Sequence, residues 1–201
     1  MKWKIWELSL LMALVLALLW AALLEGRQQA LAEQLIRLHV VAHTDERADQ
    51  ELKYYVRDRV RAEVEPLLAS AASRAEAEAE LAAHLPRIAE IAEEAVTAWG
   101  EVYSVRAHLT WERHPTRAYE SFTLPAGLYR SLRVEIGAAV GQNWWCVVFP
   151  PLCLEAARGL TALEAAGFSE EELALVAGDV SGYAMRFRVL ELISGVRGWF
   201  G

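Results

Sequence analysis

The chain has 201 residues, a formal net charge of −7 at pH 7 and a hydrophobic fraction of 55 %. This length is enough for one domain of ordinary size and an appendage. A domain with net negative charge is a poor candidate for binding nucleic acid or an anionic lipid surface, so composition disfavours both classes of function.

The N-terminus predicts export. Lys2 and Lys4 precede an uncharged apolar run over 8–24, which as a helix would span roughly 25 Å, a little less than a hydrocarbon core. Small residues at 30–32 would suit signal-peptidase cleavage. Residues 1–32 are therefore expected to be a cleaved signal peptide or a retained membrane anchor at 5–24 with a linker, and 33–201 a single exported domain.

The next part of the chain predicts one strand and three helices. Residues 36–42 are rich in β-branched and apolar side chains and predict a strand, which ends at a turn over 43–45. A helix follows, with Thr44, Asp45 or Asp49 as its N-cap and with apolar residues at helical spacing. Ser73 is placed to cap a second helix over 75–84, and Pro86 begins or kinks a third over 87–99.

The second half predicts mainly strands. Apolar and polar residues alternate over 105–111 and 131–136, and 143–149 indicates a central strand buried on both faces, stopped by Pro150. Ser169 and Glu172 predict a capped helix over 169–176, and 183–193 favours a strand passing into a helix. The fold expected is α+β, a mostly antiparallel sheet with two or three helices packed on one face, preceded by the hydrophobic N-terminal helix.

No group of residues predicts a catalytic or metal centre. His39 and His43 could share a zinc ion on a helix, but four residues of strand separate them by roughly 13 Å. Cys146 lies in an apolar strand, where a thiol is inert. Residues 137–141 are followed by a strand, so they lack the helix N-terminus of a phosphate loop. We expect no metal and no cofactor; an exported hydrolase using Cys146 or a histidine–carboxylate site is the alternative.

The two cysteines, Cys146 and Cys153, can form one bridge, and export favours it. In an extended chain their Cα atoms would lie roughly 23 Å apart, against the ~5.5–6 Å that a disulfide requires. The chain would therefore have to reverse at Pro150 and Pro151. Two buried free thiols are the alternative.

Four blocks of the sequence resemble the stage II sporulation protein R family of endospore-forming bacteria. They are IRLHVVAHTD at 36–45 with DQELKYYVRD at 49–58, the helix at Leu85-Pro86, LPAGLY and LRVEIG within 124–137, and GQNWWCVVFPPLC at 141–153. The family usually has Ala-Asn-Ser-Asp where this chain has Ala-His-Thr-Asp at 42–45. Residues 154–182 match no block and are expected to be a variable insertion.

The resemblance implies a signalling protein and not an enzyme. Similar proteins are made in the forespore and exported into the space between the forespore and mother-cell membranes. There they trigger a membrane-embedded aspartic protease of the mother cell, which cuts the precursor of the early mother-cell sigma factor. The resemblance thus implies this protease as the partner and no catalytic residue in this chain.

Two surfaces are candidates for contact with such a partner. The first is formed by Asn143, Trp144 and Trp145, because tryptophan is enriched in interface hot spots. Since side chains alternate along a strand, one tryptophan would face the core and the other outward; the alternative is that both belong to the core. The second candidate is the turn at His43 and Asp45 with Asp49 at the start of the helix.

Overall fold

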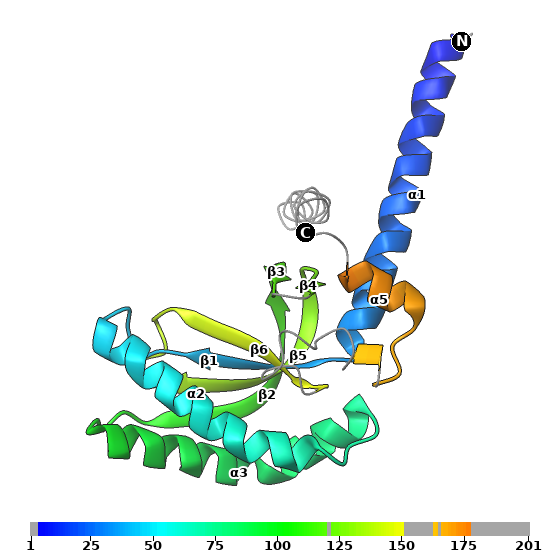
Figure 1. Ribbon diagram of the computed structural model, residues 1–201. Coiled ribbons are helices and arrows are strands. Elements are labelled where there is room, and N and C mark those ends of the chain that lie inside the picture. The colour runs from blue at the N-terminus through cyan, green and yellow to red at the C-terminus, as the bar shows by residue number, and fades with distance from the viewer. Residues whose placement is uncertain (1–3, 120–121, 151–162, 165, 178–201) are drawn as a thin grey trace.

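The computed structural model describes residues 4–119, 122–150, 163–164 and 166–177. Two helices, α2 (Arg47–Leu68) and α3 (Arg74–Trp99), cover one face of a four-stranded sheet (Figure 1). The strands lie in the order β2 (Val105–His114), β5 (Gly127–Ile136), β1 (Ile36–Val41) and β6 (Asn143–Phe149). The expected elements at 183–193 and the residue Cys153 lie outside the described residues.

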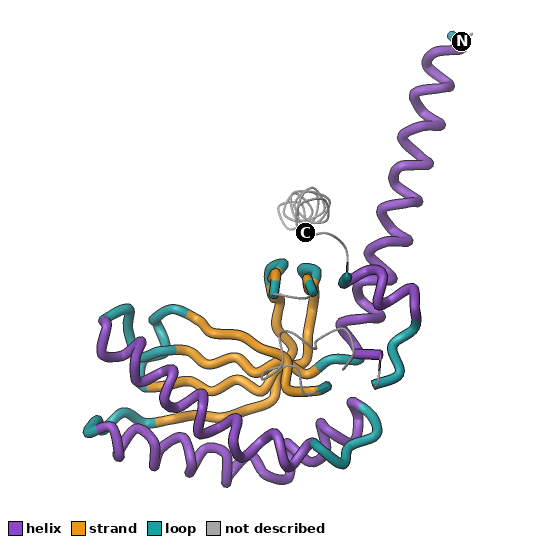
Figure 2. The backbone as a smooth tube through the Cα atoms, viewed as in Figure 1, coloured by secondary structure: helices purple, strands orange, loops and turns teal. Residues whose placement is uncertain are grey.

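The sheet is mixed, with mostly antiparallel neighbours. β1 pairs with β5 in parallel and with β6 antiparallel, and β2 pairs with β5 antiparallel. Figure 2 shows α2 and α3 below this sheet. The short hairpin of β3 (Arg117–Ala118) and β4 (Thr123–Leu124) stands on the other side. The predicted α+β fold with helices on one face is confirmed.

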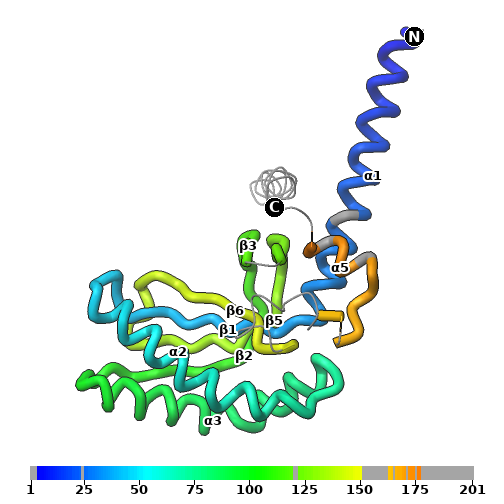
Figure 3. Tube along the Cα trace, viewed as in Figure 1, coloured from blue at the N-terminus to red at the C-terminus, as the bar shows by residue number. Residues whose placement is uncertain are grey.

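The N-terminal helix α1 (Ile5–Glu33) is continuous through the expected cleavage site at 30–32. Its large apolar side chains are exposed from Ile5 to Leu23, whereas Leu31 and Ala32 are completely buried against the domain. Within the described part of the chain, α1 is the one helix long and apolar enough to cross a membrane. Figure 3 shows it leading directly into β1 and projecting away from the sheet.

The helices α2 and α3 form because their apolar residues repeat at helical spacing and bury one face each on the sheet. Two expectations about their ends are corrected. The N-cap of α2 is Glu46 and not Thr44, Asp45 or Asp49. The predicted start of a third helix at Pro86 is wrong, because Pro86 lies inside one continuous α3. The alternative, a kink at Pro86, stays a prediction.

Packing explains why α3 continues through Pro86. A proline in a helix interior removes one backbone hydrogen bond and costs about 3 kcal/mol. Leu81 and Ile88, on either side of it, are fully buried in the main core, and burial of each such side chain contributes about 1.5–3 kcal/mol. At its ends α3 behaves as expected: the Ser73 hydroxyl accepts a hydrogen bond from the Glu76 amide, and Gly100 follows with a φ of 100°.

The strand β6 corrects a further expectation. Its side chains are buried only over its second half and not along its whole length. Among the described strands it neighbours β1 alone, and its predicted central position in the sheet stays a prediction. Asn143 is exposed and both tryptophans are half-buried, whereas Cys146 to Phe149 are buried. A continuous apolar run does not separate an edge strand from a central one, because both faces of an edge strand can still be covered by other elements.

A second core lies on the face opposite α2 and α3. It joins the end of α1 to the β3–β4 hairpin and to the short helix α5 (Glu170–Val176). Arg37 is fully buried there; its Nη2 donates to the Tyr119 hydroxyl at 3.1 Å, and its guanidinium lies over the Tyr129 ring. The Ser169–Glu172 capping box of α5 is present as predicted.

Candidate functional site

Three loops meet at one end of the sheet, and we call them the tip: residues 42–46, 100–104 and 137–142. β1 and β5 run in parallel and end there, while β2 and β6 run the opposite way and begin there. Because α1 directly precedes β1, the tip lies at the end of the sheet away from α1 (Figure 1). The predicted contact residues His43, Asp45 and Asn143 all lie at or beside this end.

His43 ties the first tip loop to the third. Its Nδ1 accepts a hydrogen bond from the Ala138 amide at 2.8 Å, and its ring stacks on Tyr103 with centroids 4.1 Å apart. Gly137 has a φ of 56°, and a Cβ there would lie 2.2 Å from His43 Nδ1. His43 is thus half-buried and committed to contacts within the molecule.

Asp45 makes a second tie between the same loops. Its carboxylate accepts a hydrogen bond from the Gln142 amide at 2.7 Å. The amide of Gly141 donates to the carbonyl of Ala42, and a Cβ at Gly141 would lie 2.1 Å from the carbonyl oxygen of Thr44. The two loops therefore touch backbone to backbone, which only glycine permits at this distance.

Asp49 and Lys53 support the tip from α2. The Thr44 hydroxyl donates to the Asp49 carboxylate, which is buried. Lys53 is also buried, and its Nζ donates to Gln50 Oε1 at 2.6 Å and to the Gln142 carbonyl at 3.1 Å. This burial lowers the pKa of the Lys53 ammonium. Of the predicted contact residues His43, Asp45 and Asp49, Asp45 alone is exposed. The other two mainly hold the tip loops in place.

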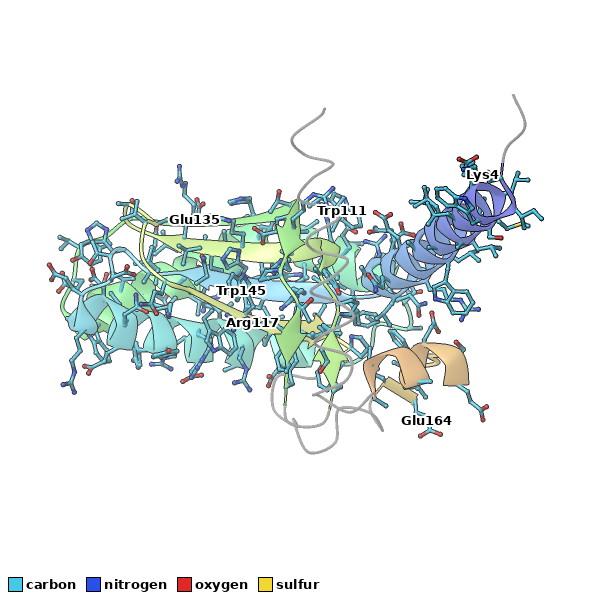
Figure 4. All side chains as sticks on the ribbon, turned by 90° about the horizontal axis from the view of Figure 1, so that it is seen from above. Lys4, Trp111, Arg117, Glu135, Trp145 and Glu164 are labelled. Carbon is cyan, nitrogen blue, oxygen red and sulfur yellow. The ribbon has the colours of Figure 1, made fainter. Side chains whose placement is uncertain are left out.

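Trp144 and Trp145 point to opposite faces of the sheet. Trp144 packs at the margin of the main core, beneath the Arg57 guanidinium of α2 at 4.8 Å. Trp145 lies on the other face, 5.4 Å from the His39 ring and under Arg117 at 4.5 Å, as Figure 4 shows for the labelled pair. Both side chains are half-buried, so each is partly packed and partly accessible.

A polar network occupies the same face as Trp145. His39 Nδ1 lies 2.9 Å from Glu112 Oε1, and His39 Nε2 lies 2.7 Å from Asn143 Oδ1. Arg133 Nη1 donates to Glu112 Oε2 at 2.9 Å. Burial by itself would raise the pKa of the Glu112 carboxyl, but hydrogen bonds from His114, His39 and Arg133 bring it well below its usual range.

The neighbouring His114 and Ser131 do not form a catalytic relay with Glu112. A relay needs the serine on one imidazole nitrogen and the carboxylate on the other. Here His114 Nε2 faces both Ser131 Oγ at 2.8 Å and Glu112 Oε1 at 3.5 Å. Ser131 is also fully buried, and burial lowers the pKa of the His114 imidazole. The network is arranged to hold strands together and not to present a nucleophile.

The described residues hold no group of three histidine, cysteine or acidic side chains that could bind a metal ion. His39 and His43 do not share a ligand position, because His39 bonds Glu112 and Asn143 while His43 bonds Ala138. Their partners differ because His39 lies within β1, whereas His43 lies in the loop that follows it. The HxxxH spacing is therefore not a metal motif in this fold.

Cys146 lies in the buried half of β6, opposite Leu38 of β1. It is not a free thiol. Its predicted partner Cys153 lies outside the described residues, so the pairing of the two cysteines stays a prediction. A buried, engaged sulfur does not suit the nucleophile that the alternative hydrolase reading required.

Two features were missed by the sequence analysis. The first is the network around Glu112, whose signal was the alternation of polar residues on β1, β2 and β5. The second is a pair of exposed valines at the tip, Val102 and Val140. No pattern in the sequence marks these, because exposure of a loop valine depends on which other loops fold beside it.

Residues 32–158 match the family model of stage II sporulation protein R. The chain belongs to this family. Stage II sporulation protein R of Bacillus subtilis (strain 168) is 35 % identical over 129 residues, which are 64 % of this chain and 58 % of that protein. The match thus spans less than two thirds of the length of the Bacillus protein. No solved structure matches the chain.

Family membership identifies a sporulation protein, and the matched residues include the three loops of the tip. The matched range begins at Ala32, the last turn of α1, and includes the six described strands together with α2 and α3. It therefore contains the tip and the Glu112 network, whereas α5 lies outside it. The apolar helix α1 fits a signal peptide or a membrane anchor.

Proposed function

We propose that this protein is an exported signal of sporulation that acts on the mother cell from the forespore side. It triggers a membrane-embedded aspartic protease of the mother cell, which then cuts the precursor of the early mother-cell sigma factor. The observation that carries this proposal is membership of the stage II sporulation protein R family over 32–158. The relative from Bacillus subtilis bears the same family description.

The helix α1 supports action from the space between the two membranes. Positively charged residues at its start and an uncharged run behind them favour an orientation with the start in the forespore cytoplasm and the domain outside. A protein so placed faces the mother-cell membrane. The proposed partner lies in that membrane.

The arrangement of side chains supports a ligand rather than an enzyme. Among the described residues, Ser131 and His114 lack relay geometry, and Cys146 is buried and engaged. The acidic side chains at the site serve hydrogen bonds within the fold, as Glu112 and Asp45 do. Activation of another protein by binding needs no catalytic group in this chain.

A reconstitution tests the proposal. The full-length chain is produced with the protease and the sigma-factor precursor in a host without sporulation genes, and precursor cleavage is followed by immunoblot. We expect cleavage only when the chain is present, and we expect the Ser131→Ala variant to act like the unaltered chain. If the precursor is not cleaved although the chain is shown to be folded and exported, the proposal is wrong. Loss of activity in a stably folded Cys146→Ser variant would instead favour the alternative, a hydrolase that uses Cys146.

A further inference from the structure

The tip carries an apolar patch that the fold itself does not cover. Val102 is 96 % exposed and Val140 is 73 % exposed. The loops that bear them are joined, since the Gly137 amide donates to the Ser104 carbonyl at 2.8 Å and the Val140 amide to the His43 carbonyl at 3.2 Å. Val140 is thus hydrogen-bonded to the backbone of His43, and Val102 directly precedes Tyr103, whose ring stacks on that of His43, so both valines are next to this pair of residues.

The patch is held in place before any partner arrives. His43 bonds Ala138, Asp45 bonds Gln142, and the close approaches at Gly137 and Gly141 leave the loops little room to move apart. A surface fixed in its binding conformation loses less conformational entropy on association than a mobile loop. Rigid loops with outward apolar side chains are the form expected of a recognition surface and not of a simple connection.

The surroundings of the patch are acidic. Asp45 and Glu46 are exposed in the first loop, and Glu101 lies in the second. Desolvation is the main cause that raises the pKa of the Tyr103 phenol, and the nearby charges of Asp49 and Glu101 add to it. Two exposed cations lie in this region, and both are paired: Arg47 with Glu51 at 2.8 Å and Arg106 with Glu135 at 3.0 Å.

The tip lies at the end of the sheet that is away from α1. β1 carries the chain from the end of α1 to the tip over six residues, roughly 20 Å of strand. Figure 1 shows α1 leaving the opposite end of the sheet. Figure 1 also shows the strands running across the direction of α1, so the tip lies at the side of the domain, away from the point where α1 leaves it, and α1 leaves it accessible to a partner.

We propose that the tip docks on the extracytoplasmic surface of a membrane protein in the facing membrane, at an apolar site flanked by lysine or arginine. Val102 and Val140 enter the apolar site, and Glu46 and Glu101 face its cations. This inference rests on the proposed function and names the surface that performs it. It moves the contact from the predicted His43, Asp45 and Asp49, which build the tip, to the side chains that the tip exposes.

The test uses the full-length chain in the reconstitution described above. A double variant, Val102→Lys with Val140→Lys, replaces apolar contact by charges that repel a basic site. A second, Glu46→Arg with Glu101→Arg, reverses the acidic flank. The matched controls are Ala82→Lys with Ala83→Lys and Glu80→Arg, which are exposed on α3 away from the tip. Thermal unfolding of each purified variant in detergent verifies that the domain is folded.

We expect each tip variant to lower precursor cleavage by about tenfold or more, the loss typical of removing an interface anchor, while the controls retain it. A photo-crosslinking residue at 140 should also link the chain to the membrane protease, and the same residue at 82 should not. Folded tip variants that retain full cleavage would overturn the inference and leave the proposed function standing. No cleavage with the unaltered chain would mean that the proposed function itself has failed.

Discussion

His39 of β1 and Glu112 of β2 are joined by a hydrogen bond across the strand that separates them, with 2.9 Å between Nδ1 and Oε1. Arg133 of the intervening β5 bonds the second oxygen of the same carboxylate. One acidic side chain thus connects three strands on the face that the long helices leave open. This face is stabilised by polar contacts, whereas the other is stabilised by apolar burial.

Replacement of Glu112 by glutamine should destabilise the domain strongly. The change removes the charge that His39 and Arg133 share, and loss of a partly buried, charge-assisted hydrogen bond costs about 2–3 kcal/mol. The free energy of unfolding of the full-length chain in detergent, from chemical denaturation, measures it. Glu80→Gln on the exposed surface of α3 is the control and should be near neutral. Equal stability of the two variants would contradict this role for Glu112.

Stability should fall as the pH is lowered below about 6.5 and fall further below about 4.5. Burial lowers the pKa of the folded His114 below its ordinary value of 6.5, so the unfolded chain binds the proton first and acidification favours unfolding. The folded pKa of Glu112 is likewise lowered from 4.5, which adds a second loss in that lower range. Thermal midpoints between pH 8 and 4 measure the effect. In His114→Gln the loss between pH 7 and 5 should be smaller than in the unaltered chain; an unchanged slope would assign it to another group.

Alanine at Gly141 should disrupt the tip. The new Cβ would lie 2.1 Å from the backbone oxygen of Thr44, which cannot move aside as a flexible side chain would. We expect a loss of about 2–4 kcal/mol in the free energy of unfolding. Gly137→Ala should behave similarly, since it meets His43 and has a positive φ.

The variant Gly100→Ala is the control that measures backbone strain without a steric clash. Gly100 has a φ of 100° but no atom within 4 Å of an added Cβ, so its substitution should cost only about 1–2 kcal/mol. Precursor cleavage should follow the same order, with Gly141→Ala the weakest activator. If Gly141→Ala proved no less stable than Gly100→Ala, the contact between the loops would not be as close as described.

The N-terminal helix should be retained as an anchor. Cleavage after Ala32 would remove Leu31 and Ala32, which are completely buried in the second core, and would cut α1 just before its end. Intact-mass analysis of the protein from the membrane fraction should show residues before 32, and alkaline carbonate should fail to extract it. A mature form beginning near residue 33 would contradict this prediction.

Cys146→Ser should act on stability and not on chemistry. Cys146 is buried and is not a free thiol, and a short-loop disulfide contributes about 2–3 kcal/mol. Thiol titration of the denatured, unreduced chain should find no free cysteine. The variant should melt earlier yet trigger cleavage in proportion to its folded fraction. A stably folded Cys146→Ser variant without any activity would support a catalytic thiol instead.

Local patterns predicted most of the elements correctly. The alternation over 105–111, the cap at Ser73 and the capping box at Ser169 depend on contacts within a few residues, and each lies where expected. Pro86 was misjudged because its local cost is outweighed by burial of Leu81 and Ile88. The strand β6 lies in the sheet as predicted, but its first half is exposed or half-buried, since an apolar run does not encode which side chains other elements cover.

By itself, the sequence determined the apolar N-terminal helix, the α+β character of the protein and its resemblance to a sporulation family, because hydropathy, caps and sequence blocks are properties of consecutive residues. Only the tertiary structure decided what the singled-out residues do. His43, Asp45 and Asp49 became supports of the tip, the two tryptophans were divided between two faces, and Val102 and Val140 were left exposed. These outcomes depend on strand order and on loop contacts between residues 33 to 99 positions apart, for which no local rule exists.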